Sequence, residues 1–252
     1  MSEHVQITRD GAVQIIRLNR PEKKNSLTAG MYGTLATAFR TANSDAAIAV
    51  MVFLGQPGIF CAGNDMADFL AASQGEGELH AFSFLQALAD NEKPLIAAVD
   101  GPAIGVGTTL MLHCDMVFAS PLARFQTPFV NLGLVPEAAS SLLGPRLMGH
   151  ARAFELLVMG EPFSSERGKE AGFVNHVVSS EELEGATLKA AHALGQKPRE
   201  AVRIARLLLK GEPSAIKQRM KEEGALFAER LKSDEARSAF AAFLQKAPRA
   251  AE

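Results

Sequence analysis

The sequence predicts an α/β protein with a helical C-terminal region. Short apolar runs typical of buried strands alternate with helical patterns from His4 to Val178, and this alternation favours a mainly parallel sheet with helices packed outside it. From Ser180 onward only helical patterns remain. We therefore expect a β/α core over residues 1–195 and a helical region over residues 196–252, packed on its own core or on a neighbouring subunit.

The predicted elements of the core depend on apolar periodicity and on the residues between the apolar runs. Aspartate and glycine at positions 10–11 separate two alternating runs, which is typical of a β-hairpin. Thr28 can cap the helix that follows it, because its hydroxyl can accept a hydrogen bond from the first helical turn. Up to residue 119 we expect strands 4–9 and 12–18, a helix 28–39, a strand 47–54, a helix 79–89, a strand 94–99, a loop 101–107, a helix 106–113 and a strand 116–119.

The second half of the chain is predicted to be mostly helical. Proline and glycine at positions 197–198 and 211–213 mark the ends of helices. After Pro136 we expect helices 140–148 and 151–159, a strand 173–178, and helices 181–194, 199–210, 213–231 and 234–245.

The composition indicates a globular protein without a nucleic-acid or membrane partner. The 252 residues are 47% hydrophobic and 21% charged, and the formal net charge is −2, so no excess of basic residues points to either partner. The apolar runs are too short or too interrupted to span a bilayer. Since we find no secretory signal at the start and no peroxisomal address at the end, we expect a cytoplasmic protein.

Neither the cysteines nor the glycine-rich loop indicates a bound cofactor. Cys61 and Cys114 lie in apolar surroundings and are predicted to be reduced. Adjacent residues point in different directions, so the run of residues 113–115 (His-Cys-Asp) does not indicate a metal site. The segment 101–107 lacks the spacing of a dinucleotide or phosphate loop. We therefore expect no metal and no separate cofactor.

Three segments could carry chemistry: Phe60–Met66, Lys93–Gly107 and Phe125–Glu137. The first two end strands in glycine-flanked turns, where backbone N–H groups can be directed at a ligand. Two such groups that converge on one carbonyl oxygen form an oxyanion hole. Taken singly, however, each glycine is more simply interpreted as part of a tight turn.

In this order and spacing, the three segments resemble the crotonase (enoyl-CoA hydratase/isomerase) superfamily over nearly the whole chain. The run Asn19-Arg20-Pro21 is a further landmark of that superfamily. The resemblance implies a spiral of β-β-α units, a C-terminal α-helical trimerisation region and an acyl-CoA thioester as substrate. Coenzyme A is then part of the substrate, and the partner is a second copy of the chain in a homotrimer or a dimer of trimers. The implied oxyanion hole uses the backbone N–H groups of Asn64 and Val106.

The positions of the two glutamates of family hydratases differ in this chain. Aligned by the motifs, they hold Thr109 and Phe129. Adding water to a double bond requires positioned acid and base groups, and these two side chains cannot supply them. The usual hydratase mechanism is therefore not supported.

Glu137 offers a different chemistry. The run 131–141 around it is similar to that of monofunctional Δ3,Δ2-enoyl-CoA isomerases, in which a glutamate at this place is the catalytic base. The resemblance implies that one carboxyl moves a proton from C2 to C4 of the acyl chain, and an apolar environment from Phe129, Leu134 and Val135 would raise its pKa. The competing interpretation makes Glu137 a first-turn acid that a helix dipole favours.

The resemblance also implies positions that contact coenzyme A. Lys23 and Lys24 follow the Asn-Arg-Pro run, Ala62 lies in the first glycine turn, and Lys246 could reach the coenzyme of a neighbouring subunit. Exposed lysines are more often simply solvated.

Two aspartates have a simpler interpretation as structural groups, and one segment has the composition of a mobile loop. Asp65 is expected to brace the first glycine turn, because aspartate commonly hydrogen-bonds local backbone. Asp115 begins a strand and is expected to be structural. The segment 67–77, rich in Gly, Ser and Glu, is predicted to be mobile.

Two other functions stay open at this stage. One is an enoyl-CoA hydratase in which Asp65 or Glu137 assists the water. The other is a non-catalytic acyl-CoA-binding protein that lost the hydratase glutamates. Glu137 is the feature that separates the isomerase from these alternatives, since a binding protein needs no carboxylate beside the oxyanion turn.

Overall fold

The computed structural model describes residues 2–68 and 81–246, with side chains up to residue 242, and contains a six-stranded sheet. The first pair of strands is the antiparallel hairpin predicted from residues 10–11, with Gly11 in the turn at a φ of 57°. All other neighbouring strands in this sheet are parallel. In spatial order the strands are β1 (Val5–Asp10), β2 (Val13–Leu18), β3 (Val50–Leu54), β4 (Leu95–Val99), β6 (Met116–Ala119) and β9 (His176–Val177).

A second, three-stranded sheet was not predicted. It consists of β5 (Pro102–Ile104), β7 (Arg124–Gln126) and β8 (Phe163–Ser164), with β5 and β7 parallel and β8 antiparallel to β7. The prediction of a loop throughout residues 101–107 was therefore wrong. Strands of two or three residues are too short to show an alternating pattern. β9 also has only two residues, so the strand predicted over 173–178 was too long.

The helices follow the predicted pattern with local differences. Thr28 caps α1 as predicted, since its Oγ1 accepts a hydrogen bond from the amide of Met31 at 3.3 Å. The helix predicted over 106–113 is one α-helical turn followed by a 3₁₀ turn. The helices are α1 (Ala29–Ser44), α3 (Ala81–Ala89), α4 (Val106–Thr109), α5 (Ser140–Phe154), α6 (Ser165–Ala171), α7 (Ser180–Gly195), α8 (Arg199–Lys210), α9 (Pro213–Leu231) and α10 (Asp234–Lys246), with 3₁₀ turns at Pro21–Lys23, Leu110–His113 and Val130–Leu132 and a π-helical turn at Glu155–Met159.

The two helices predicted over 140–148 and 151–159 meet at Gly149, whose φ of 78° and ψ of 161° are not helical. α5 covers the first and the start of the second, which continues as the π-helical turn Glu155–Met159. None of the helices in the described part of the chain is long and apolar enough to cross a membrane.

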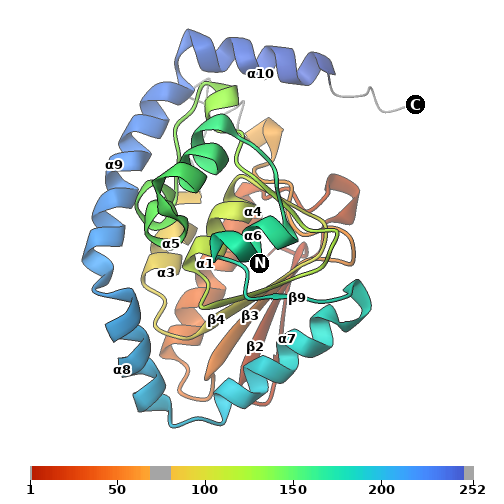
Figure 1. The fold of residues 1–252 in the computed structure, drawn as a ribbon, viewed down its shortest axis with the longest axis vertical. Coiled ribbons are helices and arrows are strands. Elements are labelled where there is room, and N and C mark those ends of the chain that lie inside the picture. Colours follow the sequence, from red (N-terminus) through yellow and green to blue (C-terminus); the bar gives the residue numbers. More distant parts are fainter. Residues whose placement is uncertain (1, 69–80, 247–252) are drawn as a thin grey trace.

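The large sheet separates two apolar cores. β3 illustrates the division, because its successive side chains point to opposite faces. Val50, Val52 and Leu54 pack with residues of α7, which covers one face. Met51 and Phe53 belong to the larger core on the other face, where α1 and α3 pack. Figure 1 shows α7 below the strands and α1 and α3 on the opposite side.

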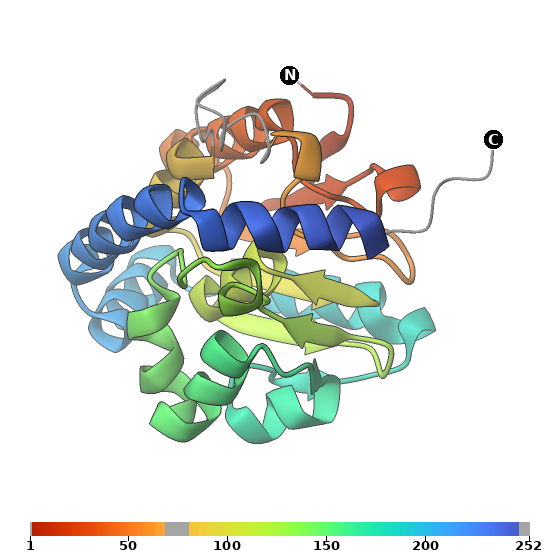
Figure 2. The same cartoon turned by 90° about the horizontal axis from the view of Figure 1, so that it is seen from above.

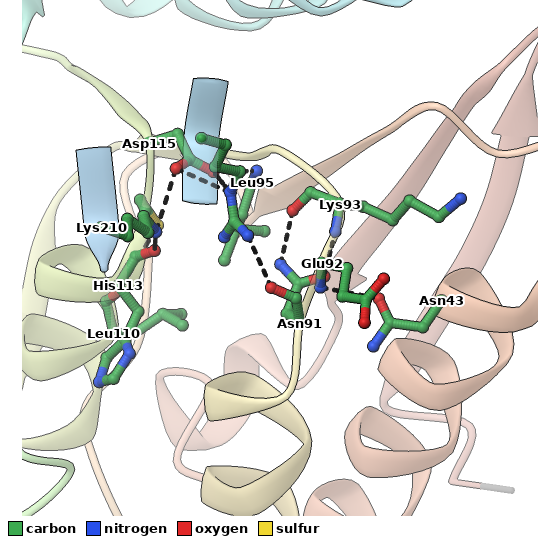
Figure 3. A network of polar contacts seen from close by, with 11 residues as sticks. Asn43, Asn91, Glu92, Lys93, Leu95, Leu110, His113, Asp115 and Lys210 are labelled. Carbon is green, nitrogen blue, oxygen red and sulfur yellow. Dashed lines mark hydrogen bonds and ion pairs between the residues drawn. The ribbon is translucent and has the colours of Figure 1, made fainter. Parts of the chain in front are cut away.

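The last three helices wrap around the larger core. α9 runs along one side of the molecule, packed on α3, and α10 crosses above the small sheet (Figures 1 and 2). The predicted boundary near residue 195 falls between α7 and α8. Asp115 fixes α8 to the core, because it accepts hydrogen bonds from Arg206 of α8 at 2.8 Å and from the amide of Leu95 at 2.8 Å. It also forms an ion pair with Lys210 at 3.0 Å, and Figure 3 shows Lys210 and Leu95 beside Asp115. Asp115 is therefore structural, as predicted.

Candidate active site

The first glycine turn, within residues 60–66, directs the backbone amide of Asn64 away from the neighbouring segment at Leu27. The amide of Leu27 donates to the carbonyl of Gly63 at 2.8 Å, and the amide of Asp65 donates to the carbonyl of Leu27 at 2.9 Å. These two bonds form a parallel bridge between Leu27 and Asn64. In such a bridge the N–H of the bridged residue itself points to the other side, so the Asn64 amide is directed away from Leu27.

The second glycine turn, within residues 101–107, leads into α4 and packs against the first glycine turn. Val106 is the first residue of α4, so its N–H has no acceptor within the helix. A Cβ on Gly107 would lie 3.0 Å from the carbonyl oxygen of Cys61, and one on Gly63 would lie 3.1 Å from that of Ile104. Glycine is thus required for this approach, and the turns that present the two amides are in direct contact.

Glu137 lies just before α5, with its carboxylate held by one hydroxyl. Since α5 begins at Ser140, the interpretation of Glu137 as a first-turn acid was wrong. Its Oε1 accepts a hydrogen bond of 2.6 Å from the hydroxyl of the fully buried Thr109. Burial raises the pKa of Glu137 to about 7, with the Thr109 hydrogen bond opposing and the charge of Glu223 adding to the rise. A carboxyl group with this pKa exchanges protons near neutrality.

One cavity joins the first turn to Glu137. It has a volume of about 290 Å³ and lies between α3 and α9. Asn64 and Glu137 are on its wall, and most of the remaining lining is apolar, as in sites for small apolar molecules. That lining includes Ala81, Phe82, Leu85, Ala138, Met220, Ala225 and Phe227.

Tyr32 orients the side chain of Asn64, which sequence reasoning missed. The hydroxyl of this buried residue of α1 donates a hydrogen bond to Oδ1 of Asn64. Burial, with a smaller contribution from the charge of Glu137, raises the pKa of Tyr32 well above its ordinary value, so the phenol stays a hydrogen-bond donor. On the sequence, Tyr32 is indistinguishable from the other apolar positions on the buried face of α1.

Asp65 braces the first turn, as predicted. Its Oδ2 accepts a hydrogen bond of 2.6 Å from Arg20, and its Oδ1 accepts one of 3.0 Å from the amide of Ala67. Burial alone would raise the pKa of Asp65, but these hydrogen bonds and the positive charge of Arg20 lower it. Asp65 is therefore an ionised structural group.

The two positions that hold glutamates in family hydratases are filled differently. Thr109 donates its hydrogen bond to Glu137, as described above. Phe129 is 6% exposed and belongs to the larger core. Neither side chain can exchange a proton with a substrate at neutral pH.

The candidate coenzyme positions lie together in part. Lys23 and Lys24 are exposed, and the carbonyl of Lys24 accepts a hydrogen bond of 3.0 Å from the amide of Ala62. This bond places the two lysines beside the first glycine turn. Lys246 is the last residue of α10, and its side chain lies outside the described part of the structure, as does most of the predicted mobile loop 67–77.

A larger cleft of about 320 Å³ lies between α3 and α8. Each of its four cations is paired with an acid: Arg206 and Lys210 with Asp115, Arg203 with Glu200, and Lys217 with Asp90. Neither Asn64 nor Glu137 lines this cleft. We therefore assign the candidate active site to the smaller cavity. In the described residues, no cluster of three or more His, Cys, Asp or Glu side chains could hold a metal ion, and Cys61 and Cys114 are free thiols.

Comparison with known proteins identifies the family. Residues 8–250 match the family model described as enoyl-CoA hydratase/isomerase. The solved structure of OdaA from Pseudomonas aeruginosa is similar, with a TM-score of 0.92 and 39% identity over 97% of this chain and 100% of that one. The chain therefore belongs to the enoyl-CoA hydratase/isomerase family and has the crotonase fold, in agreement with the resemblance found in the sequence.

Relatives in this family carry the names of different reactions. The chain is 32% identical to enoyl-CoA delta isomerase 2 of Rattus norvegicus over 98% of its own length, but spans only 65% of that protein. It is 31% identical to 2,3-dehydroadipyl-CoA hydratase of Escherichia coli over 98% of its own length and 97% of that protein. At this identity the comparison does not choose between isomerase and hydratase.

Proposed function

We propose that this protein is a Δ3,Δ2-enoyl-CoA isomerase that moves a double bond from C3 to C2 of an acyl-CoA thioester. The observation that carries the proposal is the single carboxyl of Glu137, which lines the cavity and has a pKa of about 7. An isomerase must both remove and return a proton, and a group that titrates near neutrality is suited to both tasks. The name of the rat relative gives additional support.

In the proposed mechanism, Glu137 first acts as a base. Its carboxylate takes a proton from C2 of a 3-enoyl-CoA, and the electrons of that C–H bond form a double bond between C1 and C2 while the double bond between C3 and C4 stays in place. The negative charge of the resulting dienolate moves to the thioester oxygen, where the amides of Asn64 and Val106 stabilise it; each such donor contributes roughly 3 kcal/mol. The protonated Glu137 then delivers its proton to C4, which leaves the double bond between C2 and C3.

Thr109 supports this use of a single carboxyl. Its hydroxyl fixes the orientation of Glu137 while leaving the second carboxylate oxygen for the substrate, and no hydrogen bond to that oxygen occurs among the described residues. The proposed reaction is a proton transfer within one molecule, so it needs no cofactor apart from the coenzyme A of the substrate.

The apolar cavity is the proposed site for the acyl chain, and the surface near Lys23, Lys24 and Ala62 is the proposed site for the coenzyme. Both lysines are exposed beside the first glycine turn, so their charges can meet phosphate groups without a large desolvation cost. The contribution of Lys246 from a neighbouring subunit is a part of this proposal that depends on the oligomer.

We propose that the protein acts in the cytoplasm as a homotrimer or a dimer of trimers. α8 exposes a series of apolar side chains, of which Leu208 is 79% and Leu209 is 89% exposed. Contiguous exposed apolar residues typically mark a surface that another protein covers. A second copy of the chain is the proposed occupant.

The test is a spectrophotometric assay of the purified protein with a 3-enoyl-CoA, which follows formation of the conjugated 2-enoyl thioester. We expect Glu137→Gln to lower kcat by about 10²–10⁴-fold, the usual contribution of a positioned acid or base. Glu161→Gln, at an exposed position, is the matched control and should keep the activity. A Glu137→Gln variant with the full isomerase rate would exclude the proposed mechanism.

A hydratase is the second candidate, favoured by the name of the Escherichia coli relative. The same assay with a 2-enoyl-CoA distinguishes it, because hydration removes the conjugated absorbance. Rapid hydration without isomerisation would replace our proposal by a hydratase in which Asp65 or Glu137 assists the water. Binding of acyl-CoA without either reaction, over several chain lengths, would indicate a non-catalytic binding protein.

A further inference from the structure

The backbone that follows Glu137 adopts an unusual conformation. Ala138 and Ala139 have φ angles of 60° and 54°, so two successive residues with a Cβ lie in the left-handed region. Each costs roughly 1–2 kcal/mol relative to the right-handed conformation, and such residues persist only where their surroundings hold them. Because this turn directly follows Glu137, whatever holds it also fixes where the Glu137 carboxylate lies.

A carboxylate from the C-terminal helices holds this turn. Glu223 of α9 accepts a hydrogen bond of 2.5 Å from the amide of Ala139 through Oε2, and one of 3.0 Å from the amide of Ser141 through Oε1. It is only 5% exposed. Hydrogen bonds to a buried charged acceptor are stronger than those between neutral groups. Both oxygens of Glu223 are therefore committed to the segment that links Glu137 to α5.

A second contact fixes the same turn from the other side. The Nε2 of the buried His113 lies 2.7 Å from the carbonyl of Ala138. Burial lowers the pKa of His113 to about 4, so a neutral imidazole with its proton on Nε2 donates this bond. The turn is thus held between the core, through His113, and α9, through Glu223.

We infer that Glu223 is a positioning residue for Glu137: by binding the amides of Ala139 and Ser141 it maintains the left-handed turn that presents the Glu137 carboxyl to the cavity. This inference depends on the proposed function, in which Glu137 is the base. It assigns to α9 a role in the chemistry of its own subunit, in addition to any role in assembly. The simpler alternative is that Glu223 only caps α5 and affects stability.

The electrostatic surroundings give a readout that capping alone would not change. The negative charge of Glu223 contributes to the raised pKa of Glu137, after burial. In the described part of the chain, the other ionisable groups that interact with this pair or line the same cavity include Tyr32 on α1 and His113, which are both neutral, and Arg219 and Lys221 on α9. Removing the charge of Glu223 therefore makes Glu137 easier to ionise and lowers its titration midpoint.

The experiment compares Glu223→Gln, Glu223→Asp and the matched control Glu229→Gln, which alters an exposed glutamate of the same helix. An amide places an NH₂ group against one of the two backbone donors, so we expect Glu223→Gln to lower kcat by about 10–100-fold, as for a displaced catalytic group, with KM changed less than about threefold. The carboxylate of Glu223→Asp should restore part of kcat. Glu229→Gln should match the unmodified protein.

An infrared pH titration provides a readout independent of activity. The carboxyl band of Glu137, assigned by its absence in Glu137→Gln, should titrate at a lower pH in Glu223→Gln than in the unmodified protein. If Glu223→Gln lowers Tm but leaves the titration midpoint of Glu137 and kcat unchanged, Glu223 only caps α5 and the inference is overturned. If Glu223→Gln does not fold, Glu223→Asp carries the test, and an unchanged midpoint and kcat there have the same consequence. Absence of isomerase activity in the unmodified protein would contradict the proposed function instead, and the infrared midpoints would still test Glu223.

Discussion

Two acidic residues of the candidate active-site region, Asp65 in the first glycine turn and Glu137 on the cavity wall, differ in their hydrogen-bond partners. Asp65, in the first glycine turn, receives a hydrogen bond from the guanidinium of Arg20 and one from the amide of Ala67. Glu137, before α5, receives one from the hydroxyl of Thr109. The pKa of Asp65 is lowered, whereas that of Glu137 is raised to about 7.

The difference shows how burial and hydrogen-bond partners together distinguish a structural carboxylate from the proposed catalytic one. Burial acts on both groups in the same direction and disfavours their ionised forms. At Asp65 the hydrogen bonds from Arg20, Ala67 and Ser26, together with the charge of Arg20, outweigh it, so that carboxylate stays ionised and braces the turn. A neutral hydroxyl does not outweigh it at Glu137, so that carboxyl can gain and lose a proton near neutral pH.

The largest effect that would sharpen this comparison is on stability. Asp65→Asn should lower the free energy of unfolding by about 3 kcal/mol, because it removes the nearer counter-charge of the largely buried Arg20 and leaves it with the exposed Glu22 at 3.7 Å. Because the pKa of Asp65 is lowered in the folded state, its carboxylate stabilises the fold at pH values above the ordinary aspartate pKa of 3.8. This contribution is lost as the pH falls from 3.8 through the lowered pKa. Urea unfolding at pH 7 measures the effect. An unfolding free energy equal to that of the unmodified protein would show that the ion pair contributes nothing.

Glu137→Gln should have the opposite effect on stability. A carboxyl whose pKa is raised from 4.5 to about 7 binds a proton more tightly in the folded state, so stability falls as the pH rises through this range. The side-chain amide of Glu137→Gln does not titrate, so the stability of the variant does not fall in this way. We expect the variant to gain about 1–2 kcal/mol over the unmodified protein on going from pH 5 to pH 8, less than the full shift implies because the side chain is partly exposed. Equal pH dependence of urea unfolding in the two proteins would contradict a raised pKa.

The smallest effect concerns the hydroxyl that holds Glu137. Thr109→Val removes a hydrogen bond that lowers the pKa of Glu137, so the midpoint of the pH–rate profile should move to higher pH. We expect kcat at pH 9 to change less than about tenfold, with a larger loss at pH 6 where the base becomes protonated. Thr109→Ser, which keeps the hydroxyl, should retain the original midpoint. A midpoint that moves down would show that Thr109 does not stabilise the ionised form.

The sequence predicted the large sheet better than the small one for a physical reason. The hairpin has an Asp-Gly turn at residues 10–11 between two alternating runs, and β4 is a short, continuous apolar run. Both patterns are local and are typical of strands. β5, β7 and β8 have two or three residues each, and their pairing depends on contacts between segments far apart in the chain. No local pattern records such contacts.

The candidate site was likewise predicted in part. Glu137, Asn64 and Val106 were all predicted from the resemblance of the motifs around them to those of the crotonase superfamily, and the structure brings Glu137 and Asn64 to one cavity. Tyr32 and Glu223 were missed because each lies on an amphipathic helix whose pattern is satisfied without a special role. Glu223 is one acid in a run of charged residues on α9, and only the structure shows that it is buried against the turn that follows Glu137.

The bond between Glu223 and Ala139 also orders events during synthesis. Their positions differ by 84 residues, so a nascent chain contains Glu137 well before it contains the carboxylate that holds the adjoining turn. At about 5–20 residues per second, the interval is about 4–17 s. During that time the core strands can already pair, since all of them precede α7 in the sequence. The amino-terminal three quarters of the chain can thus assemble a sheet while the proposed base still lacks the α9 carboxylate. A product cut short before α9 would carry Glu137 in a turn without that support.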